Sequence, residues 1–299
     1  MATIGKTFTF TFIIAAIAIT TQYVKTHKDV YTSQELQQKY GPTAVVVGAS
    51  EGLGATYADL LCQNGLEVVT IARREAELEE RKKELVNKHG CKVSTVVLDL
   101  AGDDVTTTMQ EIFDKHSVGL VVYNAAVFGM GSFTSSLDTQ LAAVSVNVES
   151  LTRTAHAFAS AKRTQDRKSS GFVIMSSTLG DTGAAYVATY GATKAYNTML
   201  AQGLAAEWKS KGIDVLGCVA GPIATPNFFR ANNDTSGMEF MIQTPQSVAD
   251  ECIHALGQGK YVIATGRLQK VLRFITRKLL PTQLTVDAFT GMMEKNVGQ

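Results

Sequence analysis

The stretch AVVVGASEGLGATYADLL, residues 44–61, decides the fold of this chain. Its first residues, Ala44 to Val47, are typical of a buried strand, and three glycines, Gly48, Gly52 and Gly54, separate that strand from a helical pattern. A glycine turn lets the backbone approach a pyrophosphate closely, and the N-terminus of the following helix attracts anions. The stretch therefore predicts a strand, a turn and a helix with a dinucleotide site at the turn.

Strand and helix patterns alternate along the rest of the chain. One helical pattern covers about residues 103–115, and a long one covers about residues 137–162. The expected strands have the sequences EVVTIA, KVSTVVLDL, GLVVYNAA, GFVIMSS, DVLGCVAG and YVIATG. This order predicts an α/β fold, with a doubly wound parallel sheet of about seven strands in a single domain over residues 40–299.

Length and composition agree with one main domain, since the 299 residues contain no repeat or low-complexity linker. The net charge of +1 gives no indication of nucleic-acid binding. We expect no metal site and reduced, mostly buried thiols, because metal-ligand and CxxC spacings are absent among Cys62, Cys91, Cys218 and Cys252. The five histidines are scattered and receive no role.

Four polar residues are placed for acid chemistry. Tyr190 and Lys194 stand four apart in a helix-favouring run, so their side chains share one helical face. A free tyrosine has a pKa near ~10, and an adjacent ammonium is expected to lower that pKa. Ser177 ends the run GFVIMSS, which places its hydroxyl at a strand's carboxyl end, where open α/β sheets bind ligands. With Asn147, these residues predict an acid that protonates a carbonyl beside a nicotinamide.

With these motifs in place, residues 40–266 resemble the short-chain dehydrogenase/reductase family. The resemblance rests on the GxxxGxG spacing, the YxxxK pair, Ser177, and three further polar residues in the family's order: Asp99, Asn124 and Asn147. Two positions depart from the family pattern, since Val47 and Ala126 stand where threonine and glycine are usual. The resemblance implies a Rossmann-type fold and a catalytic tetrad.

The roles of the tetrad follow from the resemblance alone. Tyr190 would donate the proton, Ser177 would hydrogen-bond the substrate oxygen, and Asn147 would position a relay water. Lys194 would hold the nicotinamide ribose and depress the pKa of Tyr190. The implied cofactor-binding residues are Gly48, Ser50, Gly52, Leu53, Gly54, Arg73, Asp99 (at the adenine), Asn124, Tyr190, Lys194, Pro222, Ile223 and Thr225.

The cofactor is expected to be NADP(H) because of the charge at the end of the second strand. An NAD enzyme would carry an acidic residue there for the ribose 2′-hydroxyl, and here that place holds Ala72. Arg73 and Arg74 follow, and a guanidinium matches a 2′-phosphate in charge and geometry. Ser50 could add a hydroxyl to the same phosphate. Arg74 also fits the start of the next helix, so Arg73 is the chosen phosphate ligand.

Residues 1–30 predict an uncleaved hydrophobic membrane anchor, a helix that precedes the domain. The run TFTFTFIIAAIAITTQYV at 7–24 has no charged residue and about the length that crosses a bilayer. A cleaved signal peptide and a packing arm in an oligomer are the alternatives. NADPH and reduced cysteines favour a cytosol-facing domain. The expected location is an endoplasmic reticulum membrane, and a mitochondrial membrane is the alternative.

Two late segments bear on the substrate. A basic amphipathic helix over about residues 267–280 could lie on a membrane or pack on its own domain. The segment 223–243, rich in Phe and Met, resembles the family's active-site flap and suits a long or flat apolar substrate. Thr244 before Pro245 predicts the helix start that ends this flap.

The opening of the domain, together with the apolar segment before it, looks most like the membrane-bound 17-beta-hydroxysteroid dehydrogenase and very-long-chain 3-oxoacyl-CoA reductase group. The resulting hypothesis is an NADPH-dependent reductase of a ketone on a lipid-like molecule. The substrates expected are a 3-oxoacyl-CoA first, and a steroid or 3-ketosphingoid second. The alternative is a nucleotide-binding accessory subunit of a membrane complex. We expect a homo-oligomer in the first case.

Overall fold

The computed structural model describes residues 31–102, 104–232, 234–236 and 238–297. The chain divides into two compact units, residues 1–32 and 33–299, and the second unit contains the whole fold described below. The expected anchor helix lies within residues 1–30 and therefore outside the described residues.

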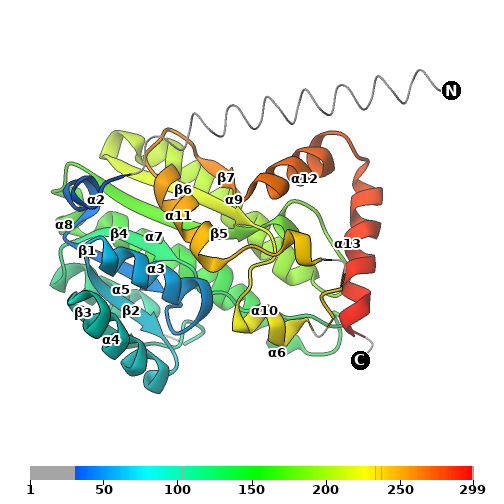
Figure 1. Ribbon diagram of the computed structural model, residues 1–299, viewed down its shortest axis with the longest axis horizontal. Coiled ribbons are helices and arrows are strands. Elements are labelled where there is room, and N and C mark those ends of the chain that lie inside the picture. The colour runs from blue at the N-terminus through cyan, green and yellow to red at the C-terminus, as the bar shows by residue number, and fades with distance from the viewer. Residues whose placement is uncertain (1–30, 103, 233, 237, 298–299) are drawn as a thin grey trace. The chain divides into compact units, whose positions relative to one another are not determined.

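A single parallel sheet of seven strands forms the centre of the second unit (Figure 1). The strand order is β3-β2-β1-β4-β5-β6-β7, and every neighbouring pair is parallel. The sequence-based expectation of seven strands is confirmed. The strands are β1 (Thr43–Val47), β2 (Glu67–Ala72), β3 (Val93–Val97), β4 (Val118–Tyr123), β5 (Ser170–Ser177), β6 (Ile213–Ala220) and β7 (Val262–Ala264).

The order reverses between β1 and β4, because β1 leads to β2 on one side and the chain later returns to β4 on the other. Such a switch point opens a crevice at the carboxyl ends of the strands, where ligands bind in open α/β sheets. All five residues of β1 and all six of β4 are buried, as expected of strands covered on both faces.

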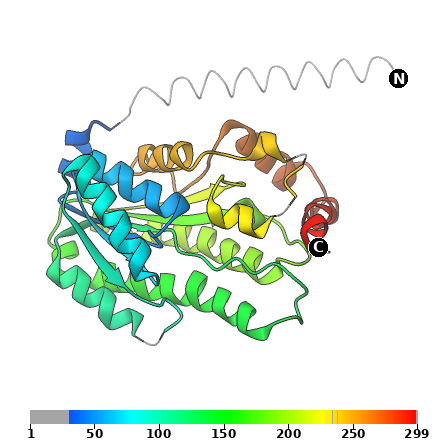
Figure 2. The same cartoon turned by 60° about the horizontal axis from the view of Figure 1, so that its bottom comes forward.

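Helices cover both faces of the sheet, with α3 and α11 on one face and α7 and α9 on the other (Figure 2). The main core lies on the α5, α7 and α9 side, where ring contacts run from Phe113 through Phe158 and Phe172 to Trp208. The principal helices are α2 (Ser33–Tyr40), α3 (Gly52–Gln63), α4 (Glu75–His89), α5 (Val105–Lys115), α6 (Leu137–Val144), α7 (Ser150–Ser160), α8 (Lys162–Gln165), α9 (Ala188–Glu207), α10 (Pro226–Ala231), α11 (Pro245–Ala255), α12 (Arg267–Lys278) and α13 (Thr282–Val297).

The prediction of one long helix over about 137–162 agrees with a helical stretch that runs from Leu137 to Ser160, but this stretch is not a regular α-helix throughout. A π-helical turn, Ser145–Glu149, separates α6 from α7, and the extended backbone of Ala161 ends α7 before α8 begins. Asn147 stands in the π turn, and its side chain bonds to groups from two other segments of the chain. Single π turns of this kind are frequent at functional sites. Hydrophobic periodicity alone does not distinguish such a turn from a regular helix.

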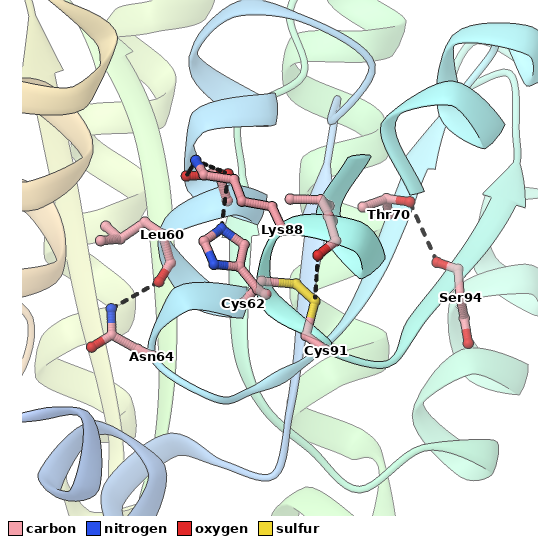
Figure 3. Close-up of a disulfide and its surroundings, with 10 residues drawn as sticks. Leu60, Cys62, Asn64, Thr70, Lys88, Cys91 and Ser94 are labelled. Atoms are coloured by element: carbon pink, nitrogen blue, oxygen red, sulfur yellow. Dashed lines mark hydrogen bonds and ion pairs between the residues drawn. A yellow bond between two sulfur atoms is a disulfide. The ribbon is translucent and has the colours of Figure 1, made fainter. Parts of the chain in front are cut away.

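The prediction of four reduced thiols is also wrong, because Cys62 and Cys91 form a disulfide (Figure 3). The bond joins the end of α3 to the loop after α4, and both Lys88 and His89 contact Asp59 one turn before Cys62. Cys218 and Cys252 are free and buried. The two partners are 29 residues apart, so only the packing of α3 beside α4 brings them together. Because two of the four cysteines are oxidised, the cysteines no longer support a cytosol-facing domain.

The segment expected to be a basic amphipathic helix forms α12, and several of its charges are paired within the unit. Lys270 pairs with Glu251, and Arg273 and Arg277 both pair with Asp181. None of the helices in the part of the chain that the structure describes is both long and apolar enough to cross a bilayer. Helix α13 follows α12 and was not predicted from the sequence. The two helices lie next to each other at the right of Figure 1.

Candidate active site

A cavity of about 1000 Å³ lies at the carboxyl ends of the strands, and we call it the chamber. Its walls come from the glycine turn, the ends of β4 and β5, helix α9, the flap over 223–243 and the C-terminal helices α12 and α13. The volume is at the upper end of the range for small-molecule and cofactor sites. The chamber therefore has room for two ligands that meet.

The glycine turn is shaped by three close approaches. Gly48 has φ +84°, and a Cβ there would lie 2.6 Å from the Cα of Ala125. A Cβ on Gly54 would lie 1.9 Å from the carbonyl oxygen of Gly48. Gly52, with φ +58°, lies against Thr225 of the flap. Gly48 and Gly52 line the chamber with Ser50 and Leu53, whereas Gly54 does not line it and serves the packing of helix on strand.

Two polar residues that follow strands also line the chamber as expected. Asn124, after β4, donates from Nδ2 to the carbonyl oxygen of Gly48 at 3.1 Å, so it ties the exits of β1 and β4 together. Asp99, after β3, accepts from the backbone N–H of Ala101 at 3.1 Å. Of the two departures from the family pattern, Val47 is buried in β1, whereas Ala126 lines the chamber. Only Ala126 is therefore placed to contact a ligand.

The two arginines after β2 differ in their contacts. Arg74 contacts Glu51 at 3.4 Å and Glu77 at 3.1 Å, and it donates to the hydroxyl of Ser50 at 3.1 Å. Arg73 is exposed and lines the chamber, and no ion pair is found for it within the described ranges. Arg73 therefore has a guanidinium available to an anionic ligand, whereas Arg74 is held by the protein.

Three of the four tetrad residues come together in the chamber. Ser177 ends β5, and Tyr190 and Lys194 lie on α9. Lys194 donates from Nζ to the carbonyl oxygen of Met175 at 3.0 Å, and its Nζ lies 5.6 Å from the ring centroid of Tyr190. The hydroxyl of Ser177 accepts from the backbone N–H of Leu179 at 3.2 Å. All three side chains line the same space, and their catalytic roles stay predictions.

The pKa of Tyr190 differs from the expectation. Burial raises the pKa of Tyr190 to about 12, and a hydrogen bond with Ser177 acts in the opposite direction. Burial also lowers the pKa of Lys194 to about 8, because an ammonium loses hydration at this site. The net pKa of Tyr190 is therefore above its ordinary value, the opposite of the direction expected from the sequence, because burial is the largest effect. Tyr190 is thus protonated at neutral pH, as an acid must be before it donates.

Asn147 does not line the chamber, and its side chain is fully engaged. Its Oδ1 accepts from the backbone N–H of Val127 at 2.8 Å, and its Nδ2 donates to the Val127 carbonyl and to the hydroxyl of Thr193, both at 3.0 Å. Both amide hydrogens are used. The residue therefore clamps the loop after β4 to helix α9, and the water-positioning role stays a prediction.

The flap is closed at its base by backbone bonds between its two ends. Gln243 donates to the carbonyl of Pro222 at 2.9 Å, and Ala224 donates to the carbonyl of Gln243 at 2.9 Å. Pro222, Ile223 and Thr225 line the chamber as expected. The hydroxyl of Thr225 caps α10 by accepting from Phe228. Thr244 caps α11 in the same way, with Pro245 in the first turn, as the sequence predicts.

Apolar residues of the flap and of α13 both contribute to the lining, and only the flap was expected from the sequence. Phe228, Met238 and Met241 of the flap line the chamber, whereas Phe229 and Phe240 are exposed. A second apolar wall comes from α13, through Ala288, Phe289, Met292 and Met293.

Helix α13 packs on α9 and on the flap. Its apolar residues pack with Tyr190 and with Phe128, whose ring is 4.7 Å from that of Tyr190. The Thr290 hydroxyl accepts from the backbone of Ala185 at 3.0 Å, and the Asn296 side chain accepts from the backbone of Asp234 at 3.0 Å. The helical spacing of Phe289, Met292, Met293 and Asn296 is the signal that could have identified this wall.

Comparison with known proteins agrees with the geometry. Residues 42–236 match a family model described as short chain dehydrogenase. A 7beta-hydroxysteroid dehydrogenase of Mediterraneibacter gnavus is 28% identical over 237 residues, which cover 78% of this chain and 89% of that protein. The human protein described as inactive hydroxysteroid dehydrogenase-like protein 1 is 26% identical over 256 residues, which cover 84% of this chain and 76% of that protein.

Solved structures agree in fold. A structure from work on 7beta-hydroxysteroid dehydrogenase stereoselectivity has a TM-score of 0.77 at 22% identity, over 86% of this chain and 99% of that chain. A short-chain dehydrogenase from Sphingobium yanoikuyae in complex with NADPH has a TM-score of 0.71 at 25% identity, over 85% of this chain and 96% of that chain.

Proposed function

Because this chain belongs to the short-chain dehydrogenase/reductase family, we propose that it is an NADPH-dependent reductase of a ketone on a lipid-like substrate. The observation that carries the proposal is the meeting of Ser177, Tyr190 and Lys194 with the glycine turn in one chamber that also has an apolar wall. A binding protein without catalysis would not require those three polar side chains around one space.

The residues present fit a dinucleotide with a 2′-phosphate. The glycine turn allows a close approach of the backbone to the phosphates. The position where an acidic residue would favour NAD holds Ala72, and the next residue, Arg73, has a guanidinium available to a 2′-phosphate. The relative from Sphingobium binds NADPH, which supports the same choice here. Asp99 and Asn124 line the adenine and central parts of the site in this proposal, and Lys194 faces the ribose of the nicotinamide.

The chain's own residues would move one proton. A bound nicotinamide supplies the hydride to the carbonyl carbon. Tyr190, protonated at neutral pH, donates its hydroxyl proton to the oxygen as negative charge develops there, and the Ser177 hydroxyl stabilises the same oxygen. The nearby Lys194 ammonium favours the phenolate that remains. Asn147 acts as a positioning residue, because it holds the Val127 loop against α9.

The substrate proposed first is now a steroid ketone. The sequence analysis placed a 3-oxoacyl-CoA first, and the bacterial relatives named 7beta-hydroxysteroid dehydrogenase move a steroid ahead of it. The wall formed by Phe289, Met292 and Met293 suits a flat or long apolar body equally. A 3-oxoacyl thioester and a 3-ketosphingoid therefore stay in the panel to be tested.

The test is NADPH oxidation by detergent-solubilised full-length protein with steroid ketones, 3-oxoacyl-CoA and 3-ketosphingoids. Tyr190→Phe removes only the donating hydroxyl and should abolish turnover. Tyr196→Phe is the matched control, since Tyr196 lies on the same helix and bonds to Thr152 outside the chamber. Turnover that survives in Tyr190→Phe would refute the mechanism, and tight NADPH binding without turnover on any substrate would refute the reductase.

The second candidate is a nucleotide-binding accessory subunit. It is favoured by the human relative, which is described as inactive. The presence of Ser177, Tyr190 and Lys194 in one chamber argues against it. Detergent extraction followed by sizing separates the two, because a stoichiometric large assembly would support the subunit and a small homo-oligomer would support the enzyme.

The exposed apolar residues Leu137, Leu141, Val144 and Met199 on α6 and α9 support a homo-oligomer.

Membrane contact is proposed at the two ends of the chain. The N-terminal anchor is argued from its sequence. Near the other end, the elbow between α12 and α13 exposes Phe274, Leu279, Leu280 and Leu284 beside the basic Lys278. Exposed apolar side chains with adjacent cations suit an anionic lipid surface. An endoplasmic reticulum membrane stays the first proposed location and a mitochondrial membrane the second, and protease protection of a tag at each terminus in intact organelles would test the topology.

A further inference from the structure

The apolar part of the chamber contains one charged cluster. Asp181 and Arg273 both line the chamber among apolar neighbours such as Leu272, Phe289 and Met292. Arg273 donates from Nε to Oδ2 of Asp181 at 2.6 Å and from Nη2 to Oδ1 at 3.0 Å. Arg277 approaches the same carboxylate at 3.3 Å. The side chains of Asp181 and Arg273 are only 7% and 16% exposed, so their charges interact with little screening.

The cluster has more positive than negative charge. One carboxylate meets two guanidinium groups, which leaves a net charge of +1. A guanidinium carries five N–H groups, and Asp181 engages only the Nε and Nη2 of Arg273. Nη1 of Arg273 makes no hydrogen bond within the residues that the structure describes. A second anion would therefore complete the cluster.

The cluster is close to the reacting groups. Asp181 follows the short 3-10 turn Thr178–Gly180, which begins directly after Ser177. Asp181 is thus four residues from Ser177, and both residues line the chamber together with Arg273. A ligand whose ketone reaches Ser177 and Tyr190 can thus extend a second polar group toward Arg273 along the apolar wall.

We propose that Arg273, supported by Arg277 and Asp181, is a carboxylate-binding subsite, and that the ligand of the chamber is an apolar acid. This inference rests on the proposed function for the position of the ketone. Arginine forms bidentate, charge-assisted bonds with a carboxylate, which select position as well as charge. A ligand with an ammonium group, such as a sphingoid base, would be repelled by the same cluster.

A purely structural role predicts different behaviour. The bonds between Arg273 and Asp181 also tie α12 to the loop after β5, and loss of that tie would disturb every ligand to the same degree. A subsite for a carboxylate distinguishes an acid from a neutral compound of the same shape. The comparison of matched ligand pairs is therefore the decisive measurement.

The experiment measures Kd by calorimetry on full-length protein saturated with NADP⁺, so that it needs no turnover. The probes are hexadecanoic acid against hexadecan-1-ol, and a steroid carboxylic acid against its primary alcohol. We expect each acid to bind the wild type about tenfold more tightly than its alcohol. Arg273→Gln should abolish this preference, because each acid loses more affinity than its alcohol. Comparison of the two pairs shows whether the chamber prefers a fatty acyl chain or a steroid ring system.

Two further variants keep the test sharp. Lys278→Gln removes one charge from the end of the same helix, outside the chamber, and should keep the acid preference. Arg273→Lys retains the charge and should keep part of the preference if Arg273→Gln fails to fold. Equal binding of acid and alcohol by the wild type would overturn the proposal, and so would an Arg273 variant that weakens both ligands equally. If the wild type oxidises no NADPH in the enzyme assay, the proposed reductase function is refuted, whereas the proposed carboxylate subsite is still tested by these binding measurements.

Discussion

Arg230 of the flap helix α10 forms an ion pair with Glu51 of the glycine turn, and Glu51 also contacts Arg74 at 3.4 Å. The two arginines hold the pKa of Glu51 below its ordinary value, although burial acts in the opposite direction. The flap is therefore tied to the loop that would hold the cofactor phosphates, and an acidic residue in that loop is neutralised from two sides.

Arg230→Gln should weaken NADPH binding. With one cation removed, the Glu51 carboxylate is less neutralised beside an anionic ligand. The pair is partly exposed, so a Kd increase of about two- to fivefold is expected. Fluorescence titration with NADPH measures it. The double variant Glu51→Gln with Arg230→Gln should restore the affinity, and a double variant as weak as the single one would contradict this electrostatic explanation.

Arg73→Gln should reduce the preference for NADPH over NADH. Charge-assisted bonds from an available guanidinium to the 2′-phosphate predict about a tenfold rise in the Kd of NADPH and little change in that of NADH. Arg74→Gln is the control, because Arg74 is held by Glu51, Glu77 and Ser50. If Arg74→Gln changes the ratio of the two Kd values more than Arg73→Gln does, the assignment of the phosphate ligand is wrong.

Lys194 should make stability depend on pH in the alkaline range. Its pKa falls from 10.5 to about 8 on folding, so between these values the unfolded chain binds the proton and the native chain does not. The free energy of unfolding should therefore rise with pH in this window, relative to Lys194→Met, by up to about 3 kcal/mol. Urea titrations at pH 7, 8, 9 and 10 measure the difference, and a difference that stays flat would exclude a depressed pKa.

Reduction of the Cys62–Cys91 disulfide should lower stability. The bond closes a loop across 29 positions, for which the chain-entropy account predicts a loss of about 3.6 kcal/mol. Urea unfolding with and without a reducing agent measures the effect. The double variant Cys62→Ser with Cys91→Ser is the control: it should have the lower stability under both conditions. A wild type that is insensitive to reduction would argue against the bond in solution.

The sequence predicted most of the fold because its signals are local. The glycine turn, the buried strands and the caps at Thr244 and Pro245 each depend on residues within a few positions of one another. The meeting of Ser177, Tyr190 and Lys194 in one chamber could also be predicted, since a strand end and a helix face fix their directions. The π turn at Asn147 was missed, because Asn147 bonds there to Val127 and Thr193, which lie elsewhere in the chain.

By itself the sequence determined the doubly wound sheet and the glycine turn, because short-range periodicity and spacing specify them, and it identified the candidate site residues Ser177, Tyr190 and Lys194 through a family resemblance. Only the tertiary structure decided the partner of Cys62, the pairing of Glu51 with Arg230, the pKa of Tyr190 and the wall that α13 adds to the chamber. These features arise where segments distant in the chain exclude water together, and burial and proximity are properties of the packed molecule that no single segment carries.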